Sequence, residues 1–561
     1  MNKRIPYPSI IFIILIMSSA QAQSVSGNYD ITRYGAVPNN GELCTGAINK
    51  AVEVCSDNGG GTVIVPSGTF ISGTIILKSK VTLHLDPGAV IKGSGNMNDY
   101  KVDGNVEGLI FAKEASHVSV TGPGILDGNG THFMNMHKLR IGGDAFQYTR
   151  QGKDYLSGSD GIADGPVVPL ERPAEMLRFM HCSNVLLQGV TIHDAPNWTI
   201  HLGDCSDSNI MGITIENNLL IPNNDGIHLT TCQNIHISDC DIKTGDDAIA
   251  VTGLTFYTEH DQHEVYKKTY TDSVCKNITV ANCTLESRSS GVRIGYGAHS
   301  IEDCTFSNLV IHDSNRGIGI FVRGKGSVKN ITFDNIIIKT RLHTGQWWGN
   351  GESIHVSCLR RLANTPLGSI QNVRFSNITA ESENGILVYG VGDSPVRNLE
   401  FDNVHVKILN SRLNKTFGGN FDLRPAAELS ESIFKHEIPG FYGQYIDGLK
   451  LNNVTINWAK GLPDFFTYAL QLSHFTNVDI NEFTGRQPHS GDLTHSAISL
   501  SHGRSVNVRN CRAPEGTGIF LSYSNIRGKG LFVNNDLRNA QKTILPSKDG
   551  FLFESNLLPG Q

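Results

Sequence analysis

Charge of either sign is scarce in this chain, and so are paired cysteines and long apolar runs. Charged residues make up 18% of the 561 residues, below the roughly 25% of an ordinary soluble domain. The 47 basic and 53 acidic side chains leave a net charge of −6, so neither nucleic acid nor an anionic membrane is an expected partner. None of the 11 cysteines shows the C-x-x-C spacing of a zinc site, and no metal is predicted.

The apolar run near the N-terminus is too short to be a membrane anchor. Residues 1–22 join Lys3 and Arg4 to the segment IIFIILIM and to small residues at Ala20 and Ala22. A basic start, an apolar segment and an A-x-A site are typical of a secretory signal peptide, whereas a transmembrane helix needs about twenty apolar residues. The remaining chain, residues 23–561, is therefore predicted to be exported to the periplasm or the extracellular space.

Export permits disulfide bonds, but the cysteines follow no pairing pattern. Several recur at similar places, among them Cys182, Cys205, Cys232 and Cys240. We interpret most of them as small apolar side chains of the interior, with one or two disulfides still possible.

A short phrase recurs along the chain: a polar residue, an Asn and an aliphatic residue. Asn184, Asn209 and Asn234 lie 25 residues apart, and alternating segments such as VLLQGVTI and IHISDCDI follow the phrase. Period-two alternation predicts β-strands. A repeat of about 25 residues with several strands and almost no helical pattern predicts a single-domain right-handed parallel β-helix. The recurring Asn side chains are expected to bond to one another along the stack.

The regions outside this repeat have distinct roles. Apolar residues at helical spacing between Leu43 and Ser56 predict a capping helix within a cap-and-first-coil region, residues 28–90. Three irregular insertions are predicted at residues 140–173, 254–273 and 410–443. Long loops in repeat folds usually gather on one face and build the binding site, although passive surface decoration stays an alternative.

Two acidic turns carry the chemistry. The first reads PNNDGI and holds Asp225, and the second reads TGDDAI and holds Asp246 and Asp247. Asp225 and Asp246 are 21 residues apart, close to one coil, and adjacent coils lie about 4.8 Å apart. The three carboxylates are therefore expected to cluster on one face, although a lone GDD can equally be a solvated turn or a calcium site.

Crowded carboxylates suit glycoside hydrolysis. Mutual repulsion raises the pKa of at least one of them, so that this group holds a proton near neutral pH. The protonated group can then donate to a leaving oxygen while an ionised neighbour activates water from the opposite face.

The chain resembles the polygalacturonase-like pectin hydrolases of glycoside hydrolase family 28. The similar segments include YDITRYGAVPNN, GTVIVPSGTF, VTGPGILDGNG, RPAEMLRF, APNWTIHLGDC, NNDGIHL and GDDAIAV. The resemblance implies Asp246 as general acid, with Asp225 and Asp247 as the pair that positions and deprotonates water. It also implies inversion of the anomeric centre, an acid–base separation of roughly 6.5–9.5 Å and no cofactor.

Two family motifs are altered. Where the family has G-H-G and S-I-G, this chain has Ser290 at the His position and Arg293 at the Ser position. The family R-I-K aligns with Gly319-Ile320-Phe321, and Arg323 follows on the same strand face. Arg293 and Arg323 either rebuild an anion-binding patch or form ion pairs with the acidic cluster. These departures make rhamnogalacturonan or other branched pectic substrates an alternative to simple polygalacturonan.

Further substrate contacts are predicted around the acidic turns. Tyr296, Trp347 and Trp348 are candidates for stacking on sugar rings, whereas Trp198 is expected to pack structurally. Asn223 and His228 could bond to sugar hydroxyls, although buried histidines such as His201 and His228 are more often structural.

Three functions compete. The leading one is an exported inverting hydrolase of galacturonate-containing pectic polysaccharide or oligosaccharide, with exo action if the insertions close one end of the pocket. The second is a pectate-lyase-like β-helix that uses calcium and an Arg base. The third is a catalytically silent glycan-binding β-helix. The oligomeric state is not predicted.

Overall fold

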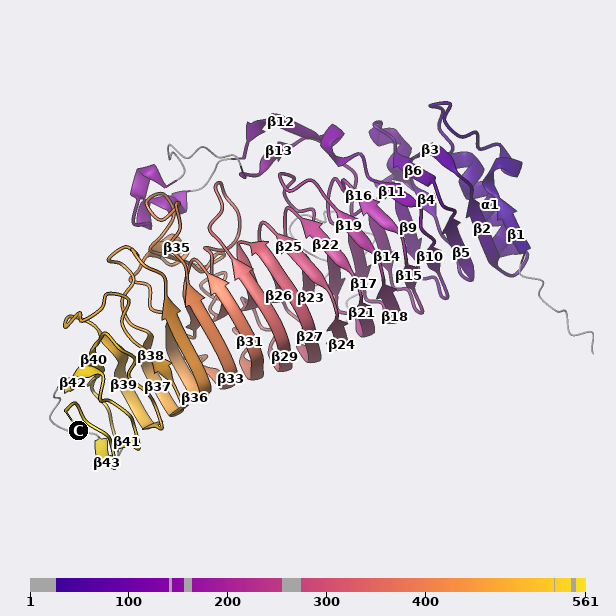
Figure 1. Ribbon diagram of the computed structural model, residues 1–561. Helices are drawn as coiled ribbons and strands as arrows, with labels where there is room; N and C mark the ends of the chain where they lie inside the picture. The colour runs from indigo at the N-terminus through magenta and orange to yellow at the C-terminus, as the bar shows by residue number, and fades with distance from the viewer. Residues whose placement is uncertain are drawn as a thin grey trace, which may run out of the picture.

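The fold is a stack of parallel β-strand coils wound along one axis (Figure 1). The computed structural model describes residues 27–140, 144–155, 164–254, 274–528, 530–545 and 551–560. The predicted signal peptide, residues 1–22, and nearly all of the predicted insertion 254–273 lie outside the described residues. The prediction of a right-handed parallel β-helix is confirmed.

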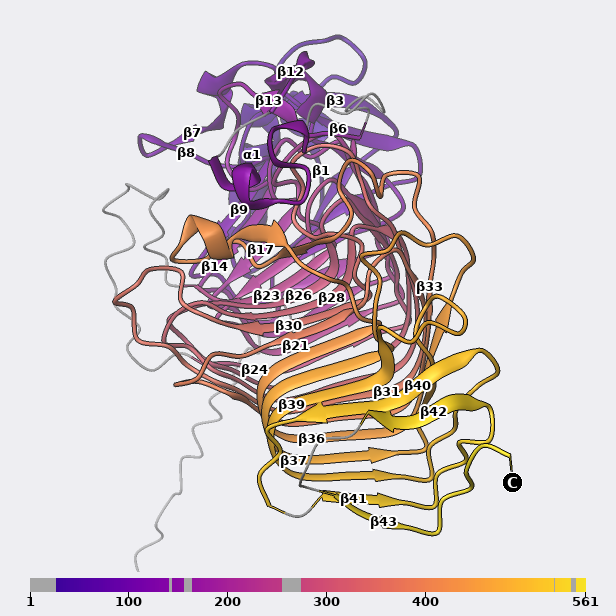
Figure 2. The ribbon, with the colours of Figure 1, turned by 90° about the vertical axis from the view of Figure 1, so that its left-hand side faces the viewer.

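The strands form three faces, and on each face consecutive coils pair in parallel. Figure 2 shows the C-terminal strands of the longest face, such as β37, β41 and β43, at the front. The face contains β1 (Gly27–Asp30), β2 (Gly61–Val65), β5 (Val81–Leu85), β10 (Ser119–Thr121), β15 (Leu186–Gln188), β18 (Ser206–Met211), β21 (Gln233–Ser238), β24 (Cys275–Ala281), β27 (Ile301–Ser314), β29 (Val328–Thr340), β31 (Ile370–Ser382), β33 (Val396–Ile408), β36 (Phe441–Trp458), β37 (Leu470–Asn481), β39 (Ser496–Arg509), β41 (Gly530–Val533) and β43 (Phe551–Glu554).

The second face is shorter, and it continues into the latter halves of the long strands from β27 onward. It contains β3 (Gly68–Ser72), β6 (Ala89–Gly93), β11 (Ile125–Asp127), β16 (Thr191–His193), β19 (Thr214–Glu216), β22 (Asp241–Thr244), β25 (Thr284–Ser287) and β38 (Thr484–Gly485).

The third face carries the candidate site, and we call it the cleft face. It contains β4 (Ile75–Ile76), β9 (Ile110–Lys113), β14 (Leu177–Met180), β17 (Ile200–Gly203), β20 (Ile227–Thr230), β23 (Ile249–Gly253), β26 (Ser290–Gly297), β28 (Arg316–Val322), β30 (Ile354–Cys358), β32 (Ile386–Tyr389), β40 (Thr517–Ser524) and β42 (Ala540–Leu545).

The helix α1 (Thr45–Asp57) covers the N-terminal end of the stack, as predicted. Its apolar stripe, Ile48, Val52 and Cys55, is fully buried because a repeat fold must cover its first coil with another element. No helix in the described part of the chain is long and apolar enough to cross a membrane.

Stacked side chains hold the coils in register. In the interior, the rings of Phe306 and Phe333 lie 4.9 Å apart, centroid to centroid, in a column that continues on the next coils. At the turns, Asn277 Nδ2 donates to Asn234 Oδ1 at 2.8 Å, as the recurring Asn predicts. The expected place of Asn209 in this column is wrong: Asn234 Nδ2 donates instead to Asp207. Asp207 has the left-handed backbone of the turn, as Asn234 does, whereas Asn209 pairs in the ladder with Leu186 and His236.

All eleven cysteines are free and buried, which agrees with their interpretation as interior side chains and leaves no disulfide. The strand registers place Cys182, Cys205, Cys232 and Cys275 at one position of four consecutive coils. Their thiols therefore fill the interior as small apolar groups do.

Shorter elements lie outside the three faces. They are the antiparallel pairs β7 (Lys101–Val102) with β8 (Asn105–Val106), β12 (Met134–Leu139) with β13 (Val167–Pro169) and β34 (Asn420–Asp422) with β35 (Ile433–Lys435), and the 3-10 turns η1 (Ile31–Tyr34), η2 (Met97–Tyr100), η3 (Gly130–Phe133), η4 (Asp144–Tyr148), η5 (Gly152–Asp154) and η7 (Leu429–Glu431).

Two of the predicted insertions meet above the coils. The segment with β12, β13, η4 and η5 starts near the N-terminal coils and reaches β35, which lies in the insertion 410–443 (Figure 1). Tyr155 packs there with Leu413, Phe417 and Ile433 in a small separate apolar cluster. Arg150 adds an ion pair with Glu437, Nη2 to Oε1 at 3.1 Å. The insertions thus brace one another along one side of the cleft face.

Candidate active site

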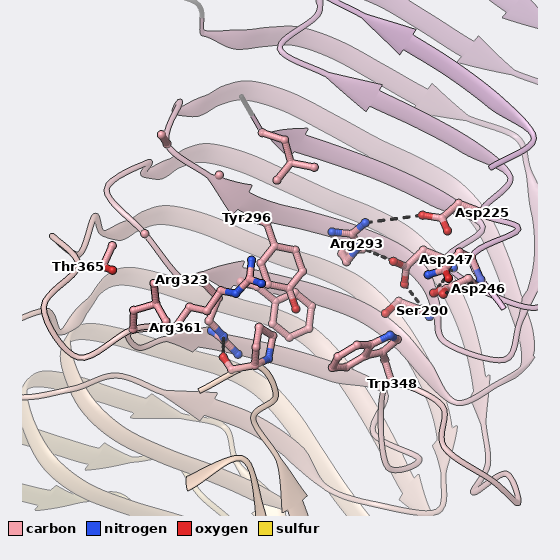
Figure 3. Close-up of a pocket in the computed structure, with 18 of the residues that line it drawn as sticks. Asp225, Asp246, Asp247, Ser290, Arg293, Tyr296, Arg323, Trp348, Arg361 and Thr365 are labelled. Atoms are coloured by element: carbon pink, nitrogen blue, oxygen red, sulfur yellow. Dashed lines mark hydrogen bonds and ion pairs between the residues drawn. The ribbon is translucent and has the colours of Figure 1, made fainter. Parts of the chain in front are cut away.

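Three buried carboxylates line one pocket of about 610 Å³ on the cleft face (Figure 3). Asp225 lies two residues before β20, Asp247 lies two residues before β23, and Asp246 precedes Asp247. The strands pair with Ile227 opposite Ile249, so Asp225 and Asp247 occupy the same place on adjacent coils. The structure therefore brings the three predicted acidic residues together.

The two acidic turns are bonded to each other. Asn224 Oδ1 accepts the Gly245 N–H at 2.7 Å, and the Gly226 N–H donates to the Asp247 carbonyl at 2.9 Å. Ser287, from the next coil, donates its hydroxyl to the Asp246 carbonyl at 2.7 Å. These bonds satisfy buried backbone groups and fix the direction in which the carboxylates point.

Arg293 holds two of the carboxylates. Its Nε donates to Asp247 Oδ2, and its Nη2 lies 3.7 Å from Asp225 Oδ2. The Ser290 N–H donates to the other oxygen of Asp247 at 3.0 Å. Burial opposes the charge of Arg293, but the carboxylates of Asp247 and Asp225 outweigh it and raise the guanidinium pKa. Arg293 thus forms ion pairs with the acidic cluster, which was the second of the two predicted roles.

Asp246 is held differently. Its carboxylate accepts N–H groups of Asp247 and Asn223, at 3.0 and 3.3 Å, and among the described residues no cation forms an ion pair with it. Burial, together with the charges of Asp225 and Asp247, raises the pKa of Asp246 well above its usual range. Burial also raises the pKa of Asp225 to about 8. The cluster therefore retains protons at neutral pH.

His228 does not reach the pocket, so its prediction as a substrate-binding residue is wrong. The ring is fully buried: Nδ1 lies 3.1 Å from Asp225 Oδ2, and Nε2 lies 3.2 Å from Thr252 Oγ1. It stacks on Trp198, with centroids 3.7 Å apart. Burial lowers the pKa of His228 well below its usual range, so a neutral imidazole supports Asp225 from behind.

The adjacent tryptophans have different surroundings. Trp348 is 39% exposed and lines the pocket. Trp347 is 3% exposed, and its indole N–H donates to the Asp164 carbonyl at 2.5 Å. The substrate-binding prediction is therefore wrong for Trp347, because this side chain is the core of the loop that presents Trp348.

The remaining predicted binding residues all line the pocket: Asn223, Arg293, Tyr296 and Arg323. Arg323, however, has no donor left for an anion in this arrangement. Its five N–H groups bond to the carbonyls of Val322, Ser357, Leu423 and Pro425 and to the Ser357 hydroxyl. Arg323 thus holds in place the loop that carries Pro425.

That loop crosses the cleft face at β30. The Asp422 carboxylate accepts the Gly349 N–H at 2.9 Å, in the turn before β30. The Ala427 N–H donates to the Arg360 carbonyl at 2.9 Å, in the turn after β30. Residues 420–427 therefore cross the cleft face from one end of β30 to the other, and we call this segment the crossbar. Its Pro425 lines the pocket.

Arg172 was not predicted as a site residue. It comes from the insertion 140–173, and its Nη1 donates to the carbonyls of Pro196 and Pro222, each at 2.8 Å. Its Nη2 donates to Asn223 Oδ1 at 3.2 Å. Arg172 thereby clamps the first acidic turn. The only feature of the sequence that could have pointed to Arg172 is the family-like segment RPAEMLRF, which begins with this residue.

No group of three His, Cys, Asp or Glu side chains among the described residues has the arrangement of a metal site. The acidic cluster contains a guanidinium, and its carboxylates accept N–H groups. The chemistry that these contacts support is proton transfer to and from the carboxyl groups.

Comparison with known proteins identifies the family. The sequence model of glycosyl hydrolases family 28 matches residues 55–417, well over half of the chain. The chain belongs to this family. It is accordingly a glycoside hydrolase, and the resemblance noted in the sequence is confirmed.

Relatives of this family 28 enzyme are distant in sequence. A probable polygalacturonase of Vitis vinifera is 26% identical over 418 residues, which cover 70% of this chain and 75% of the relative. An exopolygalacturonase of Arabidopsis thaliana is 26% identical over 338 residues, which cover 56% of this chain and 72% of the relative.

Solved structures agree on the fold. The family 28 exopolygalacturonase of Yersinia enterocolitica superposes with a TM-score of 0.56 at 18% identity, covering 81% of this chain and 78% of that one. A tailspike protein of the E. coli bacteriophage HK620 reaches 0.54 at 11% identity, covering 89% and 80%. Proteins with different functions share this degree of structural similarity, so the superpositions show only that the fold is a parallel β-helix.

Proposed function

We propose that this family 28 enzyme is exported and hydrolyses glycosidic bonds of galacturonate-containing pectic polysaccharides or oligosaccharides, with inversion at the anomeric carbon. The observation that carries the proposal is the cluster of Asp225, Asp246 and Asp247 in one buried pocket, with Arg293 paired to two of them and not to Asp246. The names of the relatives, polygalacturonase and exopolygalacturonase, support the pectic substrate.

We propose a separate role for each carboxyl group, and the contacts described above support it. Asp246 holds a proton and donates it to the glycosidic oxygen as the bond from that oxygen to the anomeric carbon breaks. Water attacks the anomeric carbon from the opposite face, and Asp247, paired with Arg293, takes its proton. Asp225 holds the water beside Asp247. The proton lost by Asp246 matches the one gained by Asp247, so no co-reactant other than water is needed.

The crossbar supports exo action. Residues 420–427 span the cleft face at β30 and bond to the turns on both sides of it, so a polysaccharide running along the coils meets a wall beyond the pocket. A chain end fits such a pocket, whereas the middle of a chain needs an open groove. We therefore propose that the enzyme removes units from a chain end.

The test is product identification from polygalacturonan, rhamnogalacturonan and pectic oligosaccharides. Wild-type enzyme is compared with Asp246→Asn and with Asp241→Asn, a matched control, because Asp241 is exposed on β22 of the same coil. We expect saturated products, a rate loss on the order of 10²–10⁴ for Asp246→Asn, no loss for Asp241→Asn and an inverted anomer in the initial product by NMR.

Other results would favour other functions. Unsaturated products and loss of activity with a chelator would show a lyase. Binding without turnover on every substrate, unchanged by Asp246→Asn, would show a silent glycan-binding protein. Products of many sizes from the first minutes would contradict exo action while leaving the hydrolase proposal in place.

A further inference from the structure

Gly319 stands where the family resemblance expects the Arg of R-I-K, and the structure leaves no room there for a side chain. A Cβ atom on Gly319 would lie 2.4 Å from the Cε2 atom of Phe321 and 3.0 Å from the Cδ atom of Arg316. Both of these residues belong to the same strand as Gly319, β28. The space above Gly319 is therefore taken by the ring of Phe321 and by the side chain of Arg316.

Arg316 is held at one edge of its guanidinium and open at the other. It lines the pocket, although it is only 3% exposed. Its Nε donates to Glu352 Oε1 at 2.7 Å, and its Cζ lies 4.9 Å from the centroid of the Phe321 ring. The two Nη groups form no hydrogen bond or ion pair with the described residues, and neither is among the buried polar atoms that lack a partner. Both Nη groups are therefore reached from the pocket.

Glu352 fixes the direction of this guanidinium. Its Oε2 accepts the Asn350 N–H at 2.6 Å, and its Oε1 lies 2.9 Å from His355 Nδ1. Burial opposes the charge of Glu352, but Arg316 and His355 outweigh it and lower the pKa of this carboxyl group to about 2. The ion pair therefore persists at neutral pH. Because the planar guanidinium is already oriented, little conformational freedom is lost when its open edge binds an anion.

The other two buried guanidinium groups that line the pocket differ from Arg316. Arg293 points toward the acidic cluster, where it meets Asp225 and Asp247 (Figure 3). Arg323 uses its five N–H groups on carbonyls and on a hydroxyl group. An anion beside Arg293 would be repelled by two carboxylates, whereas Arg316 has a single carboxylate partner among the described residues.

The strand register places Arg316 near the acidic cluster. Arg316 pairs with Ser290, and the Ser290 N–H donates to Asp247. Arg316 thus lies on the second coil after Asp247, about 10 Å along the stack, since adjacent coils lie about 4.8 Å apart. The side chain between them is the small hydroxymethyl group of Ser290, which also lines the pocket. One sugar ring fits into this interval, and its carboxylate would gain two charge-assisted hydrogen bonds from the Nη groups.

We propose that Arg316 determines the specificity of this pocket: its two Nη groups bind the free carboxylate of the galacturonate unit that lies beside the acidic cluster. Arg316 thus replaces, from another position of β28, the cations that are missing at Gly319 and Phe321. This inference rests on the proposed hydrolysis of galacturonides. It predicts discrimination against a methyl-esterified unit, because an ester has no charge and is a weaker acceptor than a carboxylate.

The experiment compares one oligosaccharide in two chemical forms. The substrate is the galacturonate-containing oligosaccharide that the enzyme cleaves fastest, used as the free acid and as its methyl ester. The two forms have the same linkages and differ in charge. We expect kcat/KM of the wild-type enzyme to be at least tenfold higher for the free acid, with most of the difference in KM. Calorimetry with Asp246→Asn should likewise show tighter binding of the free acid.

Two variants locate this preference. Arg316→Lys keeps a positive charge beside Glu352 but removes the planar fork, and we expect the acid-to-ester ratio of kcat/KM to fall at least fivefold. Gly319→Ala leaves every charge in place, but its methyl group displaces Phe321 and Arg316, so the same ratio should fall in this variant too.

Arg178→Lys is the matched control. Arg178 is also a buried arginine with a carboxylate partner, since its Nη1 donates to Glu107 Oε2 at 3.0 Å, but it does not line the pocket. We expect Arg178→Lys to lower the melting temperature without changing the acid-to-ester ratio. The ratio is decisive because a loss of stability alone lowers the rates on both forms equally.

The outcomes separate this inference from the proposed function. Hydrolysis that depends on Asp246 but uses acid and ester equally would overturn the role of Arg316 and leave the galacturonide hydrolase standing. A preference for the acid that persists unchanged in Arg316→Lys would also overturn it and would assign the preference to another cation of the pocket, such as Lys325. Absence of turnover on every galacturonate-containing oligosaccharide would overturn both proposals.

Discussion

Arg293 donates its Nε–H to Asp247 from the next coil of the stack. The family resemblance expects a Ser at the position of Arg293 and a His at the position of Ser290, three residues earlier. In this chain the backbone N–H of Ser290 bonds to the same carboxylate that Arg293 holds. Both positions thus contact one group, Asp247: Ser290 through its backbone N–H and Arg293 through a permanently charged side chain.

Arg293→Gln should lower kcat by about 100-fold or more and leave KM nearly unchanged. Without the guanidinium, Asp225 and Asp247 are two buried carboxylates with no counter-charge, so the base resists ionisation. Steady-state kinetics on the preferred substrate check this, with Arg293→Lys expected to recover part of the rate. Arg374→Gln, which removes an exposed pair with Asp402, is the control. A large rise in KM with unchanged kcat would instead make Arg293 a substrate clamp.

The activity, measured as kcat/KM, should fall only at high pH. Burial and the charges of Asp225 and Asp247 raise the pKa of Asp246, so the proposed acid keeps its proton, and the enzyme its activity, well past the pH at which an ordinary aspartate ionises. Measurement of kcat/KM from pH 4 to pH 10 checks this. An alkaline limb near pH 4 to 5 would contradict the assignment of Asp246 as acid.

Asp225→Asn should stabilise the fold at neutral and alkaline pH. Burial raises the pKa of Asp225 to about 8, above the roughly 3.9 of an unfolded aspartate. The folded state therefore binds a proton that the unfolded state releases, and stability falls as the pH rises from about 4 through about 8. The Asn variant has no carboxyl group to ionise at this position, so this loss of stability does not occur in it.

We expect the Asn variant to gain at least about 1 kcal/mol at pH 8, since one pKa unit corresponds to about 1.4 kcal/mol, and to gain little at pH 4. Urea unfolding at both pH values measures it, with Asp241→Asn as the exposed control. A gain of equal size at pH 4 would show that packing, and not ionisation, is the cause.

Arg323→Met should loosen the crossbar. The change leaves the carbonyls of Leu423 and Pro425 without the donors that now hold them, and loss of hydrogen bonds to a buried charged group costs roughly 1.5–3 kcal/mol each. We expect a lower melting temperature and a shift from one product size to several, detected by chromatography of the early products. An unchanged product pattern in a folded variant would show that the crossbar is not what restricts the enzyme to chain ends.

Much of this protein could be predicted from the sequence because it depends on local pattern. The alternation of strands such as VLLQGVTI, the recurring Asn and the apolar stripe of α1 each repeat a physical requirement at regular spacing, so they predict coils, turns and a cap. The 21-residue interval from Asp225 to Asp246 similarly places the carboxylates on adjacent coils, because one coil returns the chain to nearly the same place.

The tertiary structure decided what spacing does not encode. Trp347 and Trp348 are neighbours in sequence, yet the first packs against residue 164 and the second lines the pocket. His228 lies three residues from Asp225, yet its ring is buried behind that carboxylate and does not line the pocket. The crossbar and Arg172 join segments between 50 and about 100 residues apart. Such contacts depend on where insertions fold back over the coils, and this is set by the packing of distant side chains rather than by any period in the sequence.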